Sequence, residues 1–514
     1  MAKKSRVVKS QYNLIFSLIY NIVITFLGFA TRTVFVHSLG VEYLGLNGLF
    51  TNVLSLLSLA ELGVGSAITF SLYKPIANND SEKIKSLMHL YKIAYRIIGW
   101  IIFGLGIALT PFLKYMVNLD AGIDINYHVI YVMFLLNTVI SYWFFAYRSV
   151  IIYAHQDGYI LTKVETIFRM VSYFIQFGIL LILKNYYLYL VLPIVAGIIK
   201  NIIISNIAGK RYPIINEKKV KPLEQEEVKG IFQNVFALSL FKISGVVYGA
   251  TDNLIVSTWL GTAMVGVVSN FTMIIQLVTS YINMIFQSMY ASVGDLNASE
   301  TDSYKYVVFR RLNLLNYWIY TYCTICLGCL LNPCIKVWLG EKYCLDNSTV
   351  ILLALVFLIP GLNNIINIYK DACGLFKEVQ VRAIFTAVIN LVVSIVLVKM
   401  IGLNGVYIGT LVAYISTIYM VDCRVVFKKI FHLDVRLYYI DLLKKIMLFI
   451  VLFVVCVCGI NQILINSWAG LIVWAIILSV LVNGFLLLIY RKTEEYDYLK
   501  GIVIGFIKKK ESIK

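Results

Sequence analysis

Charged residues inside long apolar stretches are the first candidates for chemistry in this sequence. Six bases lie at such depth: Arg32, Lys92, Arg96, Arg169, Lys200 and Lys242. The acids in comparable places are Glu61, Glu165 and Asp252, with Asp422 near the end of another stretch. Arginine offers phosphate oxygens a bidentate fork, and lysine offers them a point charge. This excess of buried bases over buried acids favours an anionic ligand.

The stretches that hold these charges predict a membrane protein. Of the 514 residues, 60% are hydrophobic and 14% are charged, and the mean hydropathy is +0.82. Soluble domains are about 45–50% apolar and about 25% charged. A bilayer span needs about 20 mostly apolar residues. We expect an all-α, polytopic fold with about fourteen spans, at 11–36, 44–72, 87–113, 127–152, 160–183, 187–208, 230–258, 262–292, 306–331, 347–369, 381–400, 404–426, 438–461 and 467–490.

The Lys and Arg residues outside the spans or near their ends predict the orientation. Of the 45 in the chain, 34 fall on the side that holds both termini and 5 fall on the other side. Because cytoplasmic loops carry an excess of Lys and Arg, we expect both termini to be cytoplasmic. The net charge of +18 is then explained by topology, and it does not indicate a nucleic-acid partner.

The longest polar interval and a weak internal repeat predict the domain organisation. We expect an N-terminal lobe of six spans at 1–208, a cytoplasmic linker at 209–229, and a C-terminal lobe of spans 7–12 at 230–427. Spans 13 and 14 follow within 428–490, and a basic cytoplasmic tail occupies 491–514.

The repeat itself is short but specific in position. The first copy contains Ala30-Thr31-Arg32, then Leu39-Gly40, then Gly45. The second copy contains Ala250-Thr251-Asp252, then Leu260-Gly261, then Gly266. A further match pairs Ile167-Phe168 with Ile384-Phe385. Both copies run in the same direction through the membrane, and parallel repeats of this kind are a transporter architecture.

Four segments together carry a resemblance to a known family: Leu39 to Leu46, Glu61 to Gly65, Ser71 to Ala77, and Thr251 to Ser257. With them the chain resembles the polysaccharide transporter branch of the multidrug/oligosaccharidyl-lipid/polysaccharide exporter superfamily, the Wzx-type flippases for O-antigen or capsular repeat units. The resemblance implies two six-helix lobes around a central cavity, alternating access, and a polyprenyl-diphosphate-linked oligosaccharide as cargo. It also implies the bacterial cytoplasmic membrane as location, and a polysaccharide polymerase and glycosyltransferases as further partners.

Under this resemblance, three of the buried bases are candidates for holding the cargo. A diphosphate that leaves water needs cations along its path, so we expect Arg96, Arg169 and Lys242 to line an inward-facing cavity. Lys92 shares a helix face with Arg96, one turn away. Lys200 lies about two turns from a span end, and we expect it to snorkel to the interface.

The remaining buried charges receive different roles. Repeat symmetry puts Arg32 and Asp252 at equivalent positions, and we expect them to close an outer gate as a pair. Glu61 is the candidate for coupling to Na+ or H+. The alternative for all of these charges is a set of fixed ion pairs that hold helices together.

Three rival functions stay open at this point. They are a lipid II flippase, a multidrug exporter of the same superfamily, and a membrane polymerase or glycosyltransferase. The enzyme is disfavoured because the outward loops are short. Cys323, Cys326 and Cys329 have no fourth cysteine at ferredoxin spacing, the histidines are scattered, and no phosphate-binding Gly-rich loop precedes a Lys. We therefore expect no cofactor and no resident metal, and we leave open a disulfide between Cys334 and Cys344.

Overall fold

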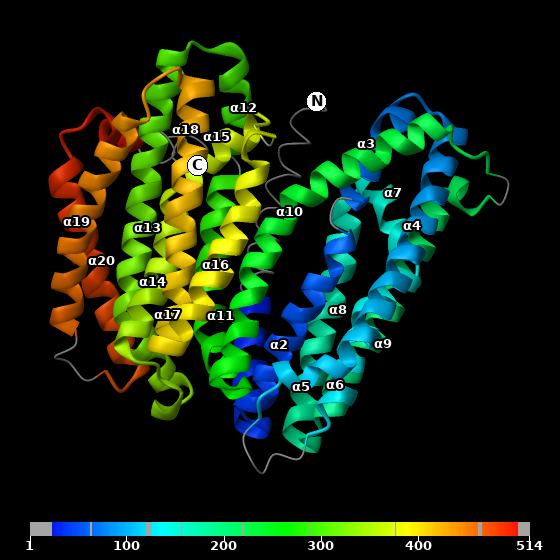
Figure 1. Cartoon of the computed structure of the whole chain (residues 1–514), viewed down its shortest axis with the longest axis horizontal. Coiled ribbons are helices and arrows are strands. Elements are labelled where there is room, and N and C mark those ends of the chain that lie inside the picture. The colour runs from blue at the N-terminus through cyan, green and yellow to red at the C-terminus, as the bar shows by residue number, and fades with distance from the viewer. Residues whose placement is uncertain are drawn as a thin grey trace, which may run out of the picture. The chain divides into compact units, whose positions relative to one another are not determined.

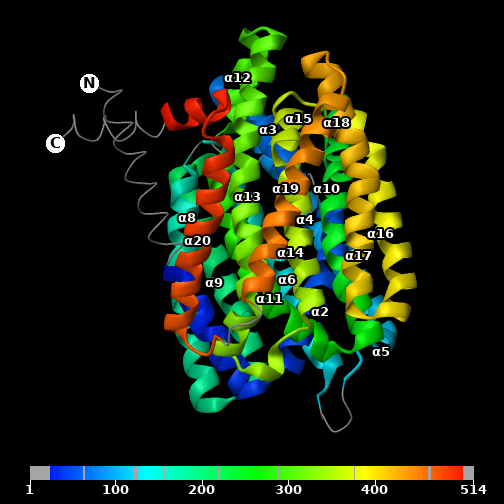
Figure 2. The same cartoon turned by 90° about the vertical axis from the view of Figure 1, so that its left-hand side faces the viewer.

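The protein is described from a computed structural model of the chain (Figures 1 and 2). The described residues are 23–61, 64–119, 125–155, 157–217, 220–287, 289–375, 377–460 and 465–501. Within these ranges all regular structure is helical and no strand occurs, which confirms the all-α expectation for this part of the chain. The chain divides into two compact units, residues 1–266 and residues 267–514.

The first unit begins with the helix Val23–Leu39 and ends just after α10. Its further elements are α2 (Val41–Leu57), η1 (Ser58–Glu61), α3 (Val64–Ala77), α4 (Ser81–Leu109), η2 (Thr110–Phe112), α5 (Leu113–Met116), α6 (Tyr127–Trp143), η3 (Ala146–Arg148), α7 (Ser149–Ala154), α8 (Gly158–Gly178), η4 (Ile179–Leu183), α9 (Tyr186–Arg211), η5 (Pro213–Asn216) and α10 (Gln225–Leu260).

The second unit begins inside α11 (Thr262–Gln287), whose first turn belongs to the first unit. Its further elements are α12 (Met289–Ser299), α13 (Asp302–Trp338), η6 (Glu341–Tyr343), α14 (Asn347–Leu362), α15 (Asn364–Ala372), η7 (Lys377–Val379), α16 (Gln380–Ile401), α17 (Leu403–Ala413), η8 (Tyr414–Tyr419), α18 (Met420–Val426), η9 (Phe427–Phe431), α19 (Arg436–Ile460) and α20 (Trp468–Tyr490).

The described helices include ten that are long and apolar enough to cross a membrane. An eleventh is obtained if Tyr127–Trp143 and Ala146–Ala154, bent by 46°, form one broken span. The chain is therefore a multi-pass membrane protein, and the count of fourteen stays a prediction. Of the other three predicted spans, the first includes the shorter apolar helix Val23–Leu39, the second is divided between α2 and α3, and the seventh lies within α10.

The two Leu-Gly segments of the repeat form matching helix starts. Gly40 (φ 100°) directly precedes α2, and Gly261 (φ 96°) directly precedes α11. Positive φ favours glycine at both places. A Cβ at Gly45 would lie 1.9 Å from the carbonyl oxygen of Thr262, and one at Gly266 would lie 2.1 Å from that of Val41. Equivalent positions thus meet reciprocally, as they do across a two-fold axis.

The polar interval at 209–229 is folded onto the first unit. α9 continues to Arg211, and α10 begins at Gln225. Lys83 at the start of α4 pairs with Glu227, and Lys85 pairs with Glu217 at 2.8 Å. The Ser86 hydroxyl donates to the carbonyl of Lys221 at 2.6 Å. The interval is therefore held against α4, while the expected lobe boundaries on either side of it stay a prediction.

Candidate functional site

Three adjoining cavities lie in the first unit, between α2, α6, α8 and α9. The basic cavity, of about 350 Å³, is lined by Glu165, Phe168, Arg169, Ser172, Tyr173, Gln176, Pro193, Ala196, Gly197 and Lys200. The bridging cavity, of about 210 Å³, is lined by Asn47, Thr51, Met133, Phe134, Asn137, Gln176, Tyr189, Leu190 and Pro193. The hydroxyl-lined cavity, of about 460 Å³, is lined by Thr51, Leu54, Ser55, Ser58, Glu61, Phe134, Asn137, Thr138 and Tyr142. Shared lining residues make the three contiguous.

Helical spacing explains how the basic cavity gathers its charges. Glu165 and Arg169 are four residues apart on α8, and therefore lie on one helix face. On α9, Pro193, Gly197 and Lys200 follow at spacings of four and three and share a face in the same way. α8 and α9 are neighbours in the first unit (Figure 1). The two faces meet, and they bring two bases and one acid to the same cavity.

The basic cavity accounts for one predicted site residue and adds another. Arg169 lies eleven residues after the start of α8, about 16 Å along the helix. Lys200, which we expected to snorkel, lines the same cavity. Its distance from the span end alone does not predict this position. Its helix face, shared with Pro193 and Gly197, is the signal that would have placed it beside Arg169.

Glu61 lies at the end of the hydroxyl-lined cavity, in η1. The hydroxyl of Tyr95 donates to Glu61 Oε1 at 2.6 Å, and the hydroxyl of Tyr142 donates to Oε2. The ring of Tyr91 packs against that of Tyr95, with centroids 4.4 Å apart. Both carboxylate oxygens are therefore held by phenols from α4 and α6. The coupling role of Glu61 stays a prediction.

Two of the other predicted cavity residues are not brought to these cavities. Lys92 and Arg96 lie on α4, outside the lining of all three. Arg96 is exposed, on a face with Ile93, Ile97 and Trp100, which are exposed as well. The side chain of Lys242 lies outside the described residues. The cargo-binding role of these three bases stays a prediction.

Arg32 and Asp252 both lie in the first unit, on the helix Val23–Leu39 and on α10. Both side chains are half-buried, and both take part in polar or electrostatic interactions. Arg32 interacts with Tyr189, which lines the bridging cavity. Their pairing as an outer gate stays a prediction.

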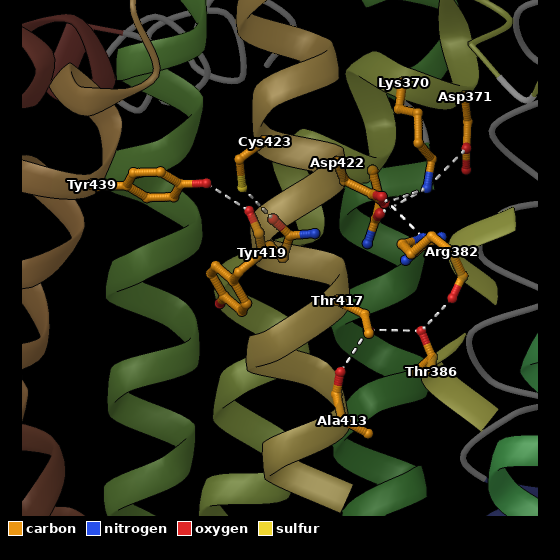
Figure 3. Close-up of polar contacts among 12 residues, drawn as sticks. Lys370, Asp371, Arg382, Thr386, Ala413, Thr417, Tyr419, Asp422, Cys423 and Tyr439 are labelled. Atoms are coloured by element: carbon orange, nitrogen blue, oxygen red, sulfur yellow. Dashed lines mark hydrogen bonds and ion pairs between the residues drawn. The ribbon is translucent and has the colours of Figure 1, made fainter. Parts of the chain in front are cut away.

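The second unit holds a buried ionic cluster that sequence reasoning missed (Figure 3). Asp422 of α18 is fully buried, and its Oδ2 lies 3.1 Å from Lys370 Nζ of α15. Its Oδ1 lies 3.1 Å from Arg382 Nε of α16. Lys370 lies near the end of α15 and Arg382 at the start of α16, where hydropathy locates span edges only to a few residues. Their position at helix ends, facing Asp422, is a packing property.

The cysteines and acids offer no metal centre in the described part of the chain. No group of three or more His, Cys, Asp or Glu side chains there could hold a metal ion. Cys334 and Cys344 are free thiols, and burial raises the pKa of Cys344.

Comparison with solved structures identifies the fold. The lipid II flippase MurJ, in an inward closed conformation, matches with a TM-score of 0.64 and 16% identity over 93% of this chain and 99% of that one. An inward-facing multidrug resistance MATE family transporter of the MOP superfamily matches with a TM-score of 0.60 and 16% identity, over 78% and 95%. A mutant of the Vibrio cholerae MATE transporter VcmN gives 0.52 and 13%, over 82% and 96%.

The chain has the fold of these membrane transporters. No protein-family model matches the sequence, and a comparison with curated proteins finds no significant match either. At 13–16% identity the likeness extends to the fold alone. Within this fold, the basic cavity of the first unit is the strongest candidate for a ligand site, because it combines volume with two bases at depth.

Proposed function

We propose that this protein is a flippase of the bacterial cytoplasmic membrane. Its cargo is a polyprenyl-diphosphate-linked oligosaccharide, which it moves from the cytoplasmic to the outer leaflet by alternating access for the synthesis of a cell-surface polysaccharide. The observation that carries the proposal is the basic cavity, where Arg169 and Lys200 face one acid, Glu165. A diphosphate in this cavity would exchange water for charge-assisted hydrogen bonds.

The charge of the cavity also separates the proposal from a multidrug exporter. A site for cationic drugs needs an excess of acids, whereas the basic cavity has one acid and two bases. Ser172, Tyr173 and Gln176 add hydrogen-bond donors around the same space. These groups complement phosphate oxygens better than they complement a cation.

The second candidate is a lipid II flippase. The observation in its favour is coverage, since the MurJ structure matches 93% of this chain and the inward-facing MATE structure 78%. Both candidates carry a lipid diphosphate, so they share the basic cavity and differ in the sugar that follows it.

Reconstituted translocation tests the proposal. A fluorescent polyprenyl-diphosphate sugar is placed in proteoliposomes, and its arrival in the outer leaflet is followed with a membrane-impermeant quencher. Arg169→Gln and Lys200→Gln each remove one charged donor, and we expect each to slow translocation roughly 10- to 100-fold, since such bonds contribute about 1.5–3 kcal/mol.

The matched control is Lys163→Gln. Lys163 is an exposed residue of α8 that does not line the cavity, and its loss should leave the rate unchanged. Wild-type rates in the Arg169→Gln, Lys200→Gln double variant would contradict the proposal. Transport of ethidium at a rate that depends on Glu165 would instead support a multidrug exporter.

A further inference from the structure

The hydroxyl-lined cavity is larger than the basic cavity and has a different chemistry. It lies between α2 and α6 and ends at η1. Its volume, about 460 Å³, is within the roughly 300–1,000 Å³ typical of small-molecule sites. Its polar lining consists of hydroxyls, one amide and one carboxylate: Thr51, Ser55, Ser58, Asn137, Thr138, Tyr142 and Glu61.

Most of these hydroxyls already donate their hydrogen to an acceptor within the protein. Ser55 donates to the carbonyl of Asn52 at 2.7 Å, Ser58 to that of Leu54 at 2.9 Å, and Thr138 to that of Phe134 at 3.1 Å. A hydroxyl that donates within its own helix still has lone pairs to offer a ligand. The cavity therefore presents acceptors, and it suits a ligand with several donors.

The two larger cavities thus have opposite hydrogen-bonding character. The basic cavity presents cationic donors from α8 and α9, and the hydroxyl-lined cavity presents acceptors from α2, α6 and η1. The bridging cavity joins them, because it shares Gln176 and Pro193 with the first and Thr51 and Asn137 with the second. A ligand that spans both would be anionic at one end and rich in donors at the other.

We propose that the hydroxyl-lined cavity binds the sugar of a carbohydrate-bearing lipid whose diphosphate lies in the basic cavity. This inference rests on the proposed function and names the part of the site that recognises the carbohydrate. Sugar hydroxyls donate to the oxygens of Ser58, Thr138 and Asn137. The apolar walls from Leu54 and Phe134 take the C–H faces of the sugar ring out of water.

A cation fits this cavity less well than a sugar does. Each oxygen of Glu61 already accepts one hydrogen bond, from the hydroxyl of Tyr95 or of Tyr142. A bare cation also needs a tight shell of oxygens, within about 2.3–2.6 Å for a hard ion such as Ca²⁺, and this cavity is far larger than such a shell. Glu61 acts here as a positioning residue, because it holds the ring of Tyr142 at the cavity wall.

Binding of two lipids to the full-length protein in nanodiscs tests the inference. The probes are undecaprenyl diphosphate and undecaprenyl-diphosphoryl-N-acetylglucosamine, which differ in the sugar and in the charge of the terminal phosphate that carries it. We expect wild-type protein to prefer the sugar-bearing lipid. Asn137→Ala should lower that preference about 3- to 10-fold, since one hydrogen bond is lost, while the affinity for the bare diphosphate stays the same.

The controls separate this inference from the proposed function. Asn52→Ala changes an asparagine of α2 outside the cavity lining and should leave the preference unchanged. Arg169→Gln should weaken both lipids equally. If Asn137→Ala does not fold, Ser58→Ala removes a single hydroxyl oxygen from the same cavity.

Three results would overturn the inference. The first is equal binding of the two lipids by wild-type protein, which leaves the proposed function standing. The second is an unchanged preference in both Asn137→Ala and Ser58→Ala. The third is a preference that stays while the sodium dependence of binding shifts in these variants, which would make the cavity a cation site. Failure of both lipids to bind wild-type protein would overturn the proposed function itself.

Discussion

Helices α8 and α9 of the first unit and α16 and α17 of the second lie at matching positions of the predicted repeat, yet they pack differently. Ile167-Phe168 and Ile384-Phe385 are 217 residues apart, and so are the starts of α9 at Tyr186 and of α17 at Leu403. The first pair lines the basic cavity. The second pair lies in direct contact (Figures 1 and 2).

Equivalent side chains show the difference directly. With the same offset, Arg169 and Lys200 of the cavity correspond to Thr386 and Thr417, whose hydroxyls are 2.7 Å apart (Figure 3). One turn further along α16, Asn390 donates to the Thr410 hydroxyl at 3.0 Å. Short polar residues close the second pair of helices, whereas long cationic ones line a space between the first.

The backbone approach has its own cause in the sequence. A Cβ at Gly405 would lie 2.3 Å from the carbonyl of Leu397, and one at Gly409 would lie 2.7 Å from the backbone nitrogen of Ser394. Glycines four apart allow this contact in membrane helices. Their counterparts in α9, 217 residues earlier, are Leu188 and Leu192, which do not permit it. The paired glycines therefore distinguish the close contact between α16 and α17, called the seam below, from the open cavity wall that α8 and α9 form.

The largest expected effect concerns the ionic cluster beside the seam. Asp422→Asn would leave Arg382 without the carboxylate it pairs with, and Lys370 with only the more distant Asp371, at 3.7 Å. We expect a loss of about 3–5 kcal/mol in the free energy of unfolding. Thermal unfolding of the purified protein measures it. Glu165→Gln, an exposed acid at the position equivalent to Arg382, is the control and should change stability little. Equal effects of the two substitutions would remove the distinction between the closely packed helices α16 and α17 and the cavity wall formed by α8 and α9.

A single methyl group in the seam should have the next largest effect. Gly409→Ala places a Cβ 2.7 Å from the backbone nitrogen of Ser394, and we expect a destabilisation of about 1–3 kcal/mol from overpacking. Gly459→Ala on α19 is the matched control, since a Cβ there meets open space. It should be neutral or stabilising by up to about 1 kcal/mol, because alanine is the better helix former. An unchanged free energy of unfolding in Gly409→Ala would show that α16 and α17 can move apart at little cost.

The hydroxyl pair in the seam should matter less than its glycines. Thr386→Val removes the hydrogen bond to Thr417, and we expect a loss of about 0.6 kcal/mol, the average for such bonds between membrane helices. Chemical unfolding in mixed micelles measures a change of this size. Thr166→Val on α8 removes only an exposed bond to its own helix and is the control. A loss above about 2 kcal/mol would mean that the threonines, and not the glycines, hold the seam.

The smallest change in stability is expected in the basic cavity itself. Arg169 is exposed there, so Arg169→Gln should change the free energy of unfolding by about 0.5 kcal/mol or less. The same variant should show the large loss of translocation described above. A strong destabilisation would instead assign Arg169 to a fixed structural role.

The sequence predicted the helical membrane fold because hydropathy and charge asymmetry are local properties that survive any packing arrangement. It also indicated that Arg169 lines a cavity, since a charge eleven residues into an apolar helix needs a polar surrounding; its cargo-binding role stays a prediction. It did not indicate that Lys200 lines the same cavity, because distance from a helix end says nothing about the helix face that a residue occupies. The cluster around Asp422 was missed for a related reason, since only packing shows which helix ends meet.

The π-helical turns within spans were equally hidden from the sequence. The π-helical turns at Ile179–Leu183 and Tyr414–Tyr419 interrupt apolar runs that contain no proline. The pair Gly405 and Gly409, by contrast, could have been recognised from its spacing alone. That spacing would have marked α17 as a tightly packed helix and, by comparison, α9 as a looser one.

The reciprocal contact of Gly45 and Gly266 has a consequence for the origin of the chain. Each glycine makes room for the first turn of the other helix, so the two halves of the contact have identical requirements. This is the property of a symmetric dimer interface, in which one surface serves both partners. Two separate copies of a single repeat could form the same contact. Joining them end to end by gene duplication would preserve it, and the two copies would then be free to diverge, one toward an open wall and the other toward a closed seam.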